Sequence, residues 1–195
     1  MIFCKCNANQ ECLDCYDWSL DQSHHESTYI EVLEIQSKLH LNDYFTYDIM
    51  REMKKHLKFT VSFNKTLVYC IDKVLRENDR YIPIQTLCYL NNLTFKDYKT
   101  FIKNHSTVFK ESLCNLSIEA YAQYMCNHFY FSFPEKKIIV EKSIKFQEEQ
   151  PTLHPLAIVC GHILVHFNNF KIHQMVEVAY VSAQSIQKVI KCLRK

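Results

Sequence analysis

The sequence is almost devoid of glycine. Gly161 is the single glycine among 195 residues, and there are only four prolines. Tight β-hairpin turns depend on residues that accept positive φ angles, above all glycine. A chain with so few of these residues therefore favours helices. The same scarcity argues against glycine-rich phosphate loops and G-x-S-x-G nucleophile elbows, so the sequence predicts a protein that is not an enzyme.

Long apolar runs are also missing. No stretch approaches the roughly 18 apolar residues of a membrane span. The start of the chain, "MIFCKCNANQ", lacks the extended apolar core of a signal peptide. We therefore expect an intracellular protein with no membrane partner. Hydrophobic residues make up 48% of the chain and charged residues 23%, which is typical of a globular protein.

The formal net charge is only +2, but the charges are unevenly distributed. Residues 1–27 contain five acidic side chains and a single lysine, Lys5. After Glu177 there is no acidic residue, and the basic residues there are Lys188, Lys191, Arg194 and Lys195. This asymmetry predicts different partners for the two ends of the chain. The alternative for the basic end is a solvated face without a partner.

Four of the ten cysteines crowd into the first fifteen positions as C-x-C-x5-C-x-x-C. These residues are Cys4, Cys6, Cys12 and Cys15. Zinc takes four thiolate or imidazole ligands, and a C-x-x-C knuckle allows two sulfurs to reach one ion. We predict one zinc ion here, with His24 and His25 as substitute ligands because the C-x-C pair is unusually tight. The alternative is a reduced segment without metal.

The other six cysteines are scattered singly, mostly in apolar helical contexts. A free cysteine in such a place behaves as a small hydrophobic residue. We predict that these six are reduced core residues. They are Cys70, Cys88, Cys114, Cys126, Cys160 and Cys192.

Apolar spacing predicts ten helices in two sets of five. In the first set, "STYIEVLEIQSKLHL" (27–41) has Ser27 as its candidate N-cap. The other predicted helices of this set are 44–57, 64–77, 83–91 and 94–104. Those of the second set are 117–130, 134–149, 154–167, 171–179 and 182–193. Pro134 and Pro155 suit the first turn of a helix, where a missing N–H has no cost.

The last two helices of each set align at an offset of 88 residues. Leu87 then aligns with Met175, and Thr94 aligns with Ser182, both as predicted N-caps. The further aligned pairs are Leu90 and Val178, Leu93 and Val181, Tyr98 and Ile186, Ile102 and Ile190, and Lys103 and Lys191. A shared apolar frame is typical of two copies of one unit. We therefore predict an all-α protein with a cysteine-rich segment (1–27) and two five-helix units (28–110 and 111–195).

The last two predicted helices are joined by a short turn at Val181 and Ser182. Such a pair either holds one helix in the major groove of DNA or simply completes a helical core. In the first case, side chains near the start of the last helix face base edges, and later basic residues contact phosphates. The predicted base-facing residues are Ser182, Gln184, Ser185 and Gln187. The predicted phosphate contacts are Lys188, Lys191 and Arg194.

Two further features fall on the predicted helix 154–167. Gly161 within a helix costs about 1 kcal/mol relative to alanine, so we expect a close helix crossing there. His162 and His166 are spaced i, i+4, but they lie on a predicted core helix and match no common metal-binding motif. We predict that they are core or surface histidines.

The stretch "HPLAIVCGHILVHFNNFKIHQMVEVAYVSAQSIQKVIKC" resembles the second cyclin repeat of the transcription factor IIB family. A proline-led buried helix is followed there by a short helix, a V-S-x-x-(S/T)-I turn and a last helix. The matching positions are Pro155, Ile158, Gly161, Ile163, Val181, Ser182, Ser185 and Ile186. The segment "CLDCYDWSL" is similar to the second half of the family's N-terminal zinc ribbon. Tyr16 and Gln187 depart from the family's glycine and basic residue.

The resemblance implies two tandem five-helix cyclin-like repeats preceded by a small zinc-knuckle segment. It also implies a shortened, nuclear transcription initiation factor. Such a factor binds the complex of TATA-binding protein with promoter DNA and links it to RNA polymerase. The alternative is a cyclin-like regulatory subunit or a helical protein-interaction adaptor that does not bind DNA.

Overall fold

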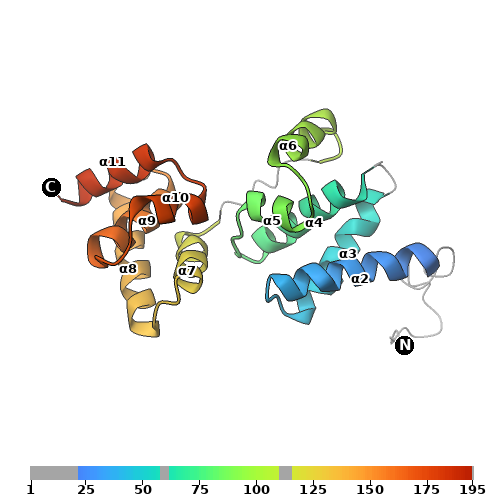
Figure 1. Cartoon of the computed structure of the whole chain (residues 1–195), viewed down its shortest axis with the longest axis horizontal. Helices are drawn as coiled ribbons and strands as arrows, with labels where there is room; N and C mark the ends of the chain where they lie inside the picture. The colour runs from blue at the N-terminus through green and yellow to red at the C-terminus, as the bar shows by residue number, and fades with distance from the viewer. Residues whose placement is uncertain (1–21, 58–61, 110–115, 195) are drawn as a thin grey trace.

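The computed structural model describes residues 22–57, 62–109 and 116–194, and these residues form helices without any strand. The helices are α2 (Gln22–Lys38), α3 (Asp43–Leu57), α4 (Phe63–Glu77), α5 (Ile84–Leu90), α6 (Phe95–Asn104), α7 (Ile118–His128), α8 (Phe133–Glu149), α9 (Pro155–His166), α10 (Ile172–Ala179) and α11 (Ala183–Leu193). The all-α prediction is confirmed. Figure 1 shows α2–α6 and α7–α11 as two neighbouring bundles.

The first bundle is built around α4. Residues 66–71 are all buried, because α4 packs against both α3 and α5. A second contact ties α2 to α3 through the buried side chain of Gln36. Its amide donates to the Leu41 carbonyl (3.1 Å) and to Asp43 Oδ1 (3.1 Å), and it accepts from the Thr46 hydroxyl. Most buried polar groups in proteins are hydrogen-bonded, and Gln36 follows this rule.

The second bundle has its own hydrophobic core around α9. Every residue from 156 to 163 is buried, and α9 contacts α7, α8, α10 and α11. A helix that is apolar on all sides belongs at the centre of a core, which explains why "LAIVCG" has no amphipathic pattern. No helix in the described ranges combines the length and the apolar character that crossing a bilayer requires.

The two bundles have the same order of elements at similar spacings. Helices α5 and α10 start 88 residues apart, at Ile84 and Ile172, and the starts of α3 and α8 are 90 apart. Left-handed residues follow at matching positions: Asn92 (φ 53°) after α5 and Tyr180 (φ 54°) after α10. The same relation holds for His40 (φ 51°) after α2 and Tyr130 (φ 56°) after α7.

Both predicted N-caps of the last helices are confirmed. The Thr94 hydroxyl accepts from the Asp97 N–H (3.1 Å), and the Ser182 hydroxyl accepts from the Ser185 N–H (3.2 Å). Each hydroxyl satisfies one of the backbone donors that a helix start leaves without an intrahelical partner.

One local prediction is wrong. Ser27 lies inside α2, which begins at Gln22, so Ser27 is not an N-cap. Serine favours capping positions, but within a helix it costs only a few tenths of a kcal/mol. The segment between Gln22 and Ser27 contains no glycine or proline that would stop the helix.

The two bundles contact each other through side chains that follow α4 and side chains at the start of α7 and within it. Asp79 accepts hydrogen bonds from the N–H (2.8 Å) and the hydroxyl of Ser117. The Tyr81 ring packs on Tyr121 and Tyr124, with ring centroids 4.5 Å and 5.3 Å apart. The contact is polar at one end and aromatic at the other.

Candidate nucleic-acid interface

Helices α10 and α11 are joined by three residues, Tyr180, Val181 and Ser182. Tyr180 closes α10 in the left-handed conformation, with its N–H donating to the Val176 carbonyl (3.0 Å). Ser182 is extended (φ −63°, ψ 143°) and starts the next helix. The predicted short turn is therefore present, and it forms a helix–turn–helix arrangement with α10 and α11.

The first turn of α11 carries two serine hydroxyls in contact. Ser182 Oγ and Ser185 Oγ are 2.8 Å apart, so one donates to the other. The second hydroxyl then keeps its own hydrogen for an outside acceptor. The start of a helix also carries partial positive charge from its free N–H groups, which favours an anionic acceptor such as a phosphate oxygen.

The inner face of α11 fixes which side chains point outward. Ile186 and Val189 are fully buried, and Leu193 is half-buried in the same core. Gly161 of α9 allows this close approach, because a Cβ there would lie 2.5 Å from Val189 Cγ1. The predicted close helix crossing at Gly161 is confirmed.

The outer face of α11 carries five polar or basic side chains, which we call the basic stripe. They are Gln184, Gln187, Lys188 and Lys191 of the helix and Arg194 at its C-cap, and all five are exposed. At about 100° per residue they fall within an arc of roughly 120°, opposite the buried residues. Of the two remaining predicted DNA contacts, Ser185 is half-buried and Ser182 is exposed.

The positive charges of the stripe are not neutralised within the bundle. Among residues 22–57, 62–109 and 116–194, none forms an ion pair with Lys188, Lys191 or Arg194. By contrast, Lys73 of the first bundle is bound to Glu52 at 2.6 Å. An unpaired set of cations on one helix face attracts a polyanion without regard to its sequence.

Tyr180, in the turn that leads into α11, was not among the predicted site residues. Its side chain is 49% exposed, and it directly precedes the two residues that lead into α11. A bulky residue at positive φ is uncommon, and Asn92 holds the equivalent place in the first bundle. The 88-residue offset aligns Tyr180 with Asn92, and asparagine is a residue type that favours the left-handed conformation. This alignment could have identified Tyr180 from the sequence.

The predicted zinc ligands Cys4, Cys6, Cys12 and Cys15 lie outside the described residues. His24 and His25 lie in α2, but the structure does not describe their side chains. Within the described ranges there is no group of three or more His, Cys, Asp or Glu side chains that could hold a metal. The zinc site therefore stays a prediction.

The scattered cysteines behave as predicted wherever the structure describes them. Cys70, Cys88, Cys126 and Cys160 are free and buried, Cys192 is free and half-buried, and Cys114 lies outside the description. Burial raises the pKa of Cys88 and Cys126 to about 11 and that of Cys160 to about 12. These thiols stay protonated at neutral pH and are poor metal ligands.

His162 is a core histidine, as predicted, since only 4% of it is exposed. Its ring stacks on His166 at 5.7 Å and meets Phe146 edge-on at 5.6 Å. Burial, together with the nearby His166 and Lys142, lowers its pKa to about 4. His166 is exposed, and Lys142 Nζ lies 3.1 Å from its Nε2.

These observations define a helix–turn–helix with a basic outer face, held on a buried central helix. A scan against protein-family models and a search of curated proteins each found no match to this chain.

Proposed function

We propose that this protein is a shortened transcription initiation factor of the transcription factor IIB type. In this proposal, α2–α6 and α7–α11 are its two cyclin-like repeats. The protein binds TATA-binding protein on promoter DNA and links that complex to RNA polymerase in the nucleus. The N-terminal cysteines hold one zinc ion in this proposal.

The observation that carries the proposal is the unpaired basic stripe on α11. Five exposed polar or basic side chains share one face of the last helix, and no acidic residue follows Glu177. A positively charged face without internal partners binds a polyanion favourably, because counterions held by the polyanion are released on contact. The helix–turn–helix also provides the geometry to place such a face in a DNA groove.

The paired architecture gives additional support. Each bundle has a buried third helix, a short fourth helix, a left-handed residue and a hydroxyl-capped last helix, in that order. Two copies of one unit in tandem present two similar surfaces to an elongated target. Two such surfaces suit a protein that binds DNA together with a second protein.

Roles within the stripe follow from chemistry. Gln184 and Gln187 carry amides that pair with the N6 and N7 positions of adenine in the major groove. Lys188, Lys191 and Arg194 lie farther along the helix and reach phosphates, which position the helix but do not read sequence. The spare serine hydroxyl at the start of α11 binds a phosphate oxygen or a base edge.

An electrophoretic mobility experiment tests the proposal. Promoter DNA and TATA-binding protein form a first complex, and the full chain is added at low salt. We expect a further shift that requires TATA-binding protein and disappears when all three basic residues, Lys188, Lys191 and Arg194, are changed to glutamine. Absence of any further shift with folded protein would count decisively against the proposal.

A second candidate is a cyclin-like subunit or adaptor that binds a helical protein partner and no DNA. It is favoured by exposed apolar and tyrosine side chains on α2 and α3, where Ile30 is 56% exposed and Tyr44 and Tyr47 are 62% and 61% exposed. Aromatic side chains of this kind are enriched at protein interfaces. A pull-down with a kinase, with binding that does not respond to ionic strength, would support this candidate.

A further inference from the structure

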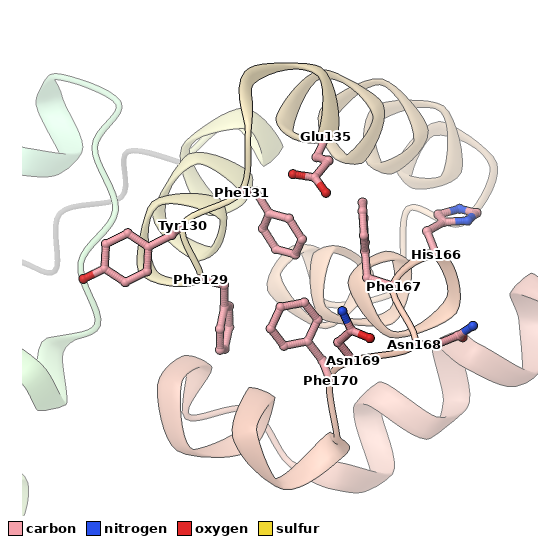
Figure 2. Close-up of a pocket in the computed structure, with 9 residues that line it drawn as sticks. All are labelled: Phe129, Tyr130, Phe131, Glu135, His166, Phe167, Asn168, Asn169 and Phe170. Carbon is pink, nitrogen blue, oxygen red and sulfur yellow. The ribbon is translucent and has the colours of Figure 1, made fainter.

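An open pocket of about 420 Å³ lies where α7 leads into α8 and α9 leads into α10 (Figure 2). Four phenylalanines line it: Phe129, Phe131, Phe167 and Phe170. Phe131 is 8% exposed, and its ring centroid lies 4.7 Å from that of Phe167 and 5.3 Å from that of Phe170. No residue of α11 contributes to the lining, so the pocket is separate from the basic stripe.

Glu135 supplies a carboxylate to this aromatic pocket. Figure 2 shows its side chain extending from α8 toward the rings of Phe131 and Phe167. Hydrogen bonds from the Ser132 hydroxyl and N–H lower the pKa of Glu135, so the group is ionised at neutral pH. Both bonds, at 2.6 Å and 2.7 Å, go to Oε2. No described residue donates a hydrogen bond to Oε1 of Glu135 or forms an ion pair with it.

We propose that this pocket binds the guanidinium group of an arginine side chain presented by a protein partner. Aromatic faces attract cations through their electron-rich centres, and a planar guanidinium can also stack on a phenyl ring. The free Oε1 of Glu135 completes the site as a charge-assisted acceptor. Asn169 also lines the pocket, and Figure 2 shows its side chain beside Phe170.

Two other ligand classes fit the pocket less well. A nucleotide would stack on the same rings, but its phosphates would meet the Glu135 carboxylate, and the lining contains no lysine or arginine. A trimethylammonium group would suit the aromatic faces but has no N–H to donate to Oε1. At the rim, Tyr130 is 92% exposed, which offers apolar contact to the residues around an arginine in a polypeptide.

The test is an NMR titration of the full, isotope-labelled chain with the tripeptide acetyl-Gly-Arg-Gly-amide. We expect saturable shifts at residues 168–170 and at the rings of the pocket, with a Kd on the order of 1 mM for so small a ligand. Replacing arginine by the uncharged isostere citrulline should weaken binding about tenfold. Trimethyllysine in place of arginine should bind more weakly than arginine.

Substitutions in the protein add independent tests. Glu135→Gln removes the charge but keeps an acceptor for the cap of α8, since glutamine also serves in a capping box. We expect it to weaken arginine binding about tenfold, whereas Glu148→Gln, an exposed position near the far end of α8, should have no effect. Lys188→Gln with Lys191→Gln should leave peptide binding unchanged, because the stripe lies outside the pocket.

Three results would overturn this inference. The first is equal binding of the arginine and citrulline peptides to the unaltered chain. The second is tighter binding of adenosine monophosphate at the same residues, which would assign the pocket to a nucleotide. The third is the absence of shifts in the pocket at peptide concentrations of about 20 mM, roughly twentyfold above the expected Kd.

Discussion

Gly161 of α9 lies directly under Val189 of α11. A Cβ atom at position 161 would be 2.5 Å from Val189 Cγ1 and 3.1 Å from Val189 Cβ. Both distances are shorter than ordinary van der Waals contact, and the valine side chain is short and fully buried. The single glycine of the chain therefore sets how closely the DNA-binding candidate helix approaches its support.

Gly161→Ala should destabilise the protein by about 1–3 kcal/mol, because the new methyl group overpacks a filled contact. On an exposed helix face the same change would stabilise the protein by about 1 kcal/mol, because alanine has the higher helix propensity. The sign of the change in stability therefore shows whether position 161 is crowded. Urea denaturation monitored by circular dichroism measures the free energy of unfolding.

The partner substitution Val189→Ala provides the control for this effect. Alone it should cost about 2 kcal/mol through a cavity. In the double variant the methyl group introduced at position 161 fills part of that cavity. The two costs should therefore not add, and the coupling energy should be about 0.5–3 kcal/mol. Strict additivity would show that the two residues do not contact each other.

Neutralising lysines of the basic stripe should change how DNA affinity responds to salt. Each phosphate contact contributes about one unit to the slope of log K against log salt concentration, so Lys188→Gln and Lys191→Gln together should reduce the slope by about 2. Fluorescence anisotropy with a labelled promoter duplex between low and moderate salt measures this slope.

The matched control changes Lys137 and Lys145 to glutamine, since both are exposed on α8, outside the stripe. This pair should leave the slope unchanged. An equal loss in both double variants would mean that DNA binds through diffuse charge and not through α11.

The purified chain should contain about one equivalent of zinc. Cys12→Ser with Cys15→Ser removes the knuckle and should bring the zinc content to background in elemental analysis. Cys192→Ser, at a half-buried position far along the chain, should leave the zinc content unchanged. A content below about half an equivalent in the unaltered protein would remove the zinc site from the proposal.

His162 should make the stability depend on pH. Its pKa is lowered to about 4 in the folded state, whereas an unfolded histidine titrates near 6.5. Between pH 4 and pH 6.5 the unfolded chain therefore binds more protons than the folded protein. The contribution of His162 to stability is full above pH 6.5 and is lost as the pH falls toward 4. The loss is on the order of 3 kcal/mol.

Urea titrations at several pH values between 7 and about 4 measure this loss. His162→Leu should reduce the pH dependence in this range but not remove it, because the pKa values of His56, His154 and His166 are lowered too. His173→Gln, at an exposed position on α10, should leave the profile unchanged. An identical pH profile for His162→Leu and the unaltered chain would show that His162 does not contribute.

Helix content and helix faces were largely predictable because both are encoded locally. Nine of the ten described helices, all except α2, start within one residue of the predicted positions. Their start signals are neighbours in sequence, such as Thr94 with Asp97 and Ser182 with Ser185. The exposed stripe of α11 was also predictable, since periodicity separates Lys188 and Lys191 from the buried Ile186 and Val189.

The start of α2 was not predictable, because a polar segment without glycine or proline carries no strong stop signal. The aromatic pocket was missed for a different reason. Phe131 and Phe167 are 36 residues apart, and only the packing of α8 on α9 brings their rings to 4.7 Å. A local pattern does not specify such a pair.

The sequence by itself determined that this protein is helical and that its last helix has one basic face, since apolar spacing and glycine scarcity act within a few residues. Only the tertiary structure decided that Val189 is the neighbour of Gly161, that Glu135 keeps one free oxygen beside four phenylalanines, and that His162 is buried without a charge. These features arise from contacts between helices, which depend on shapes and distances that hydrophobic periodicity does not encode.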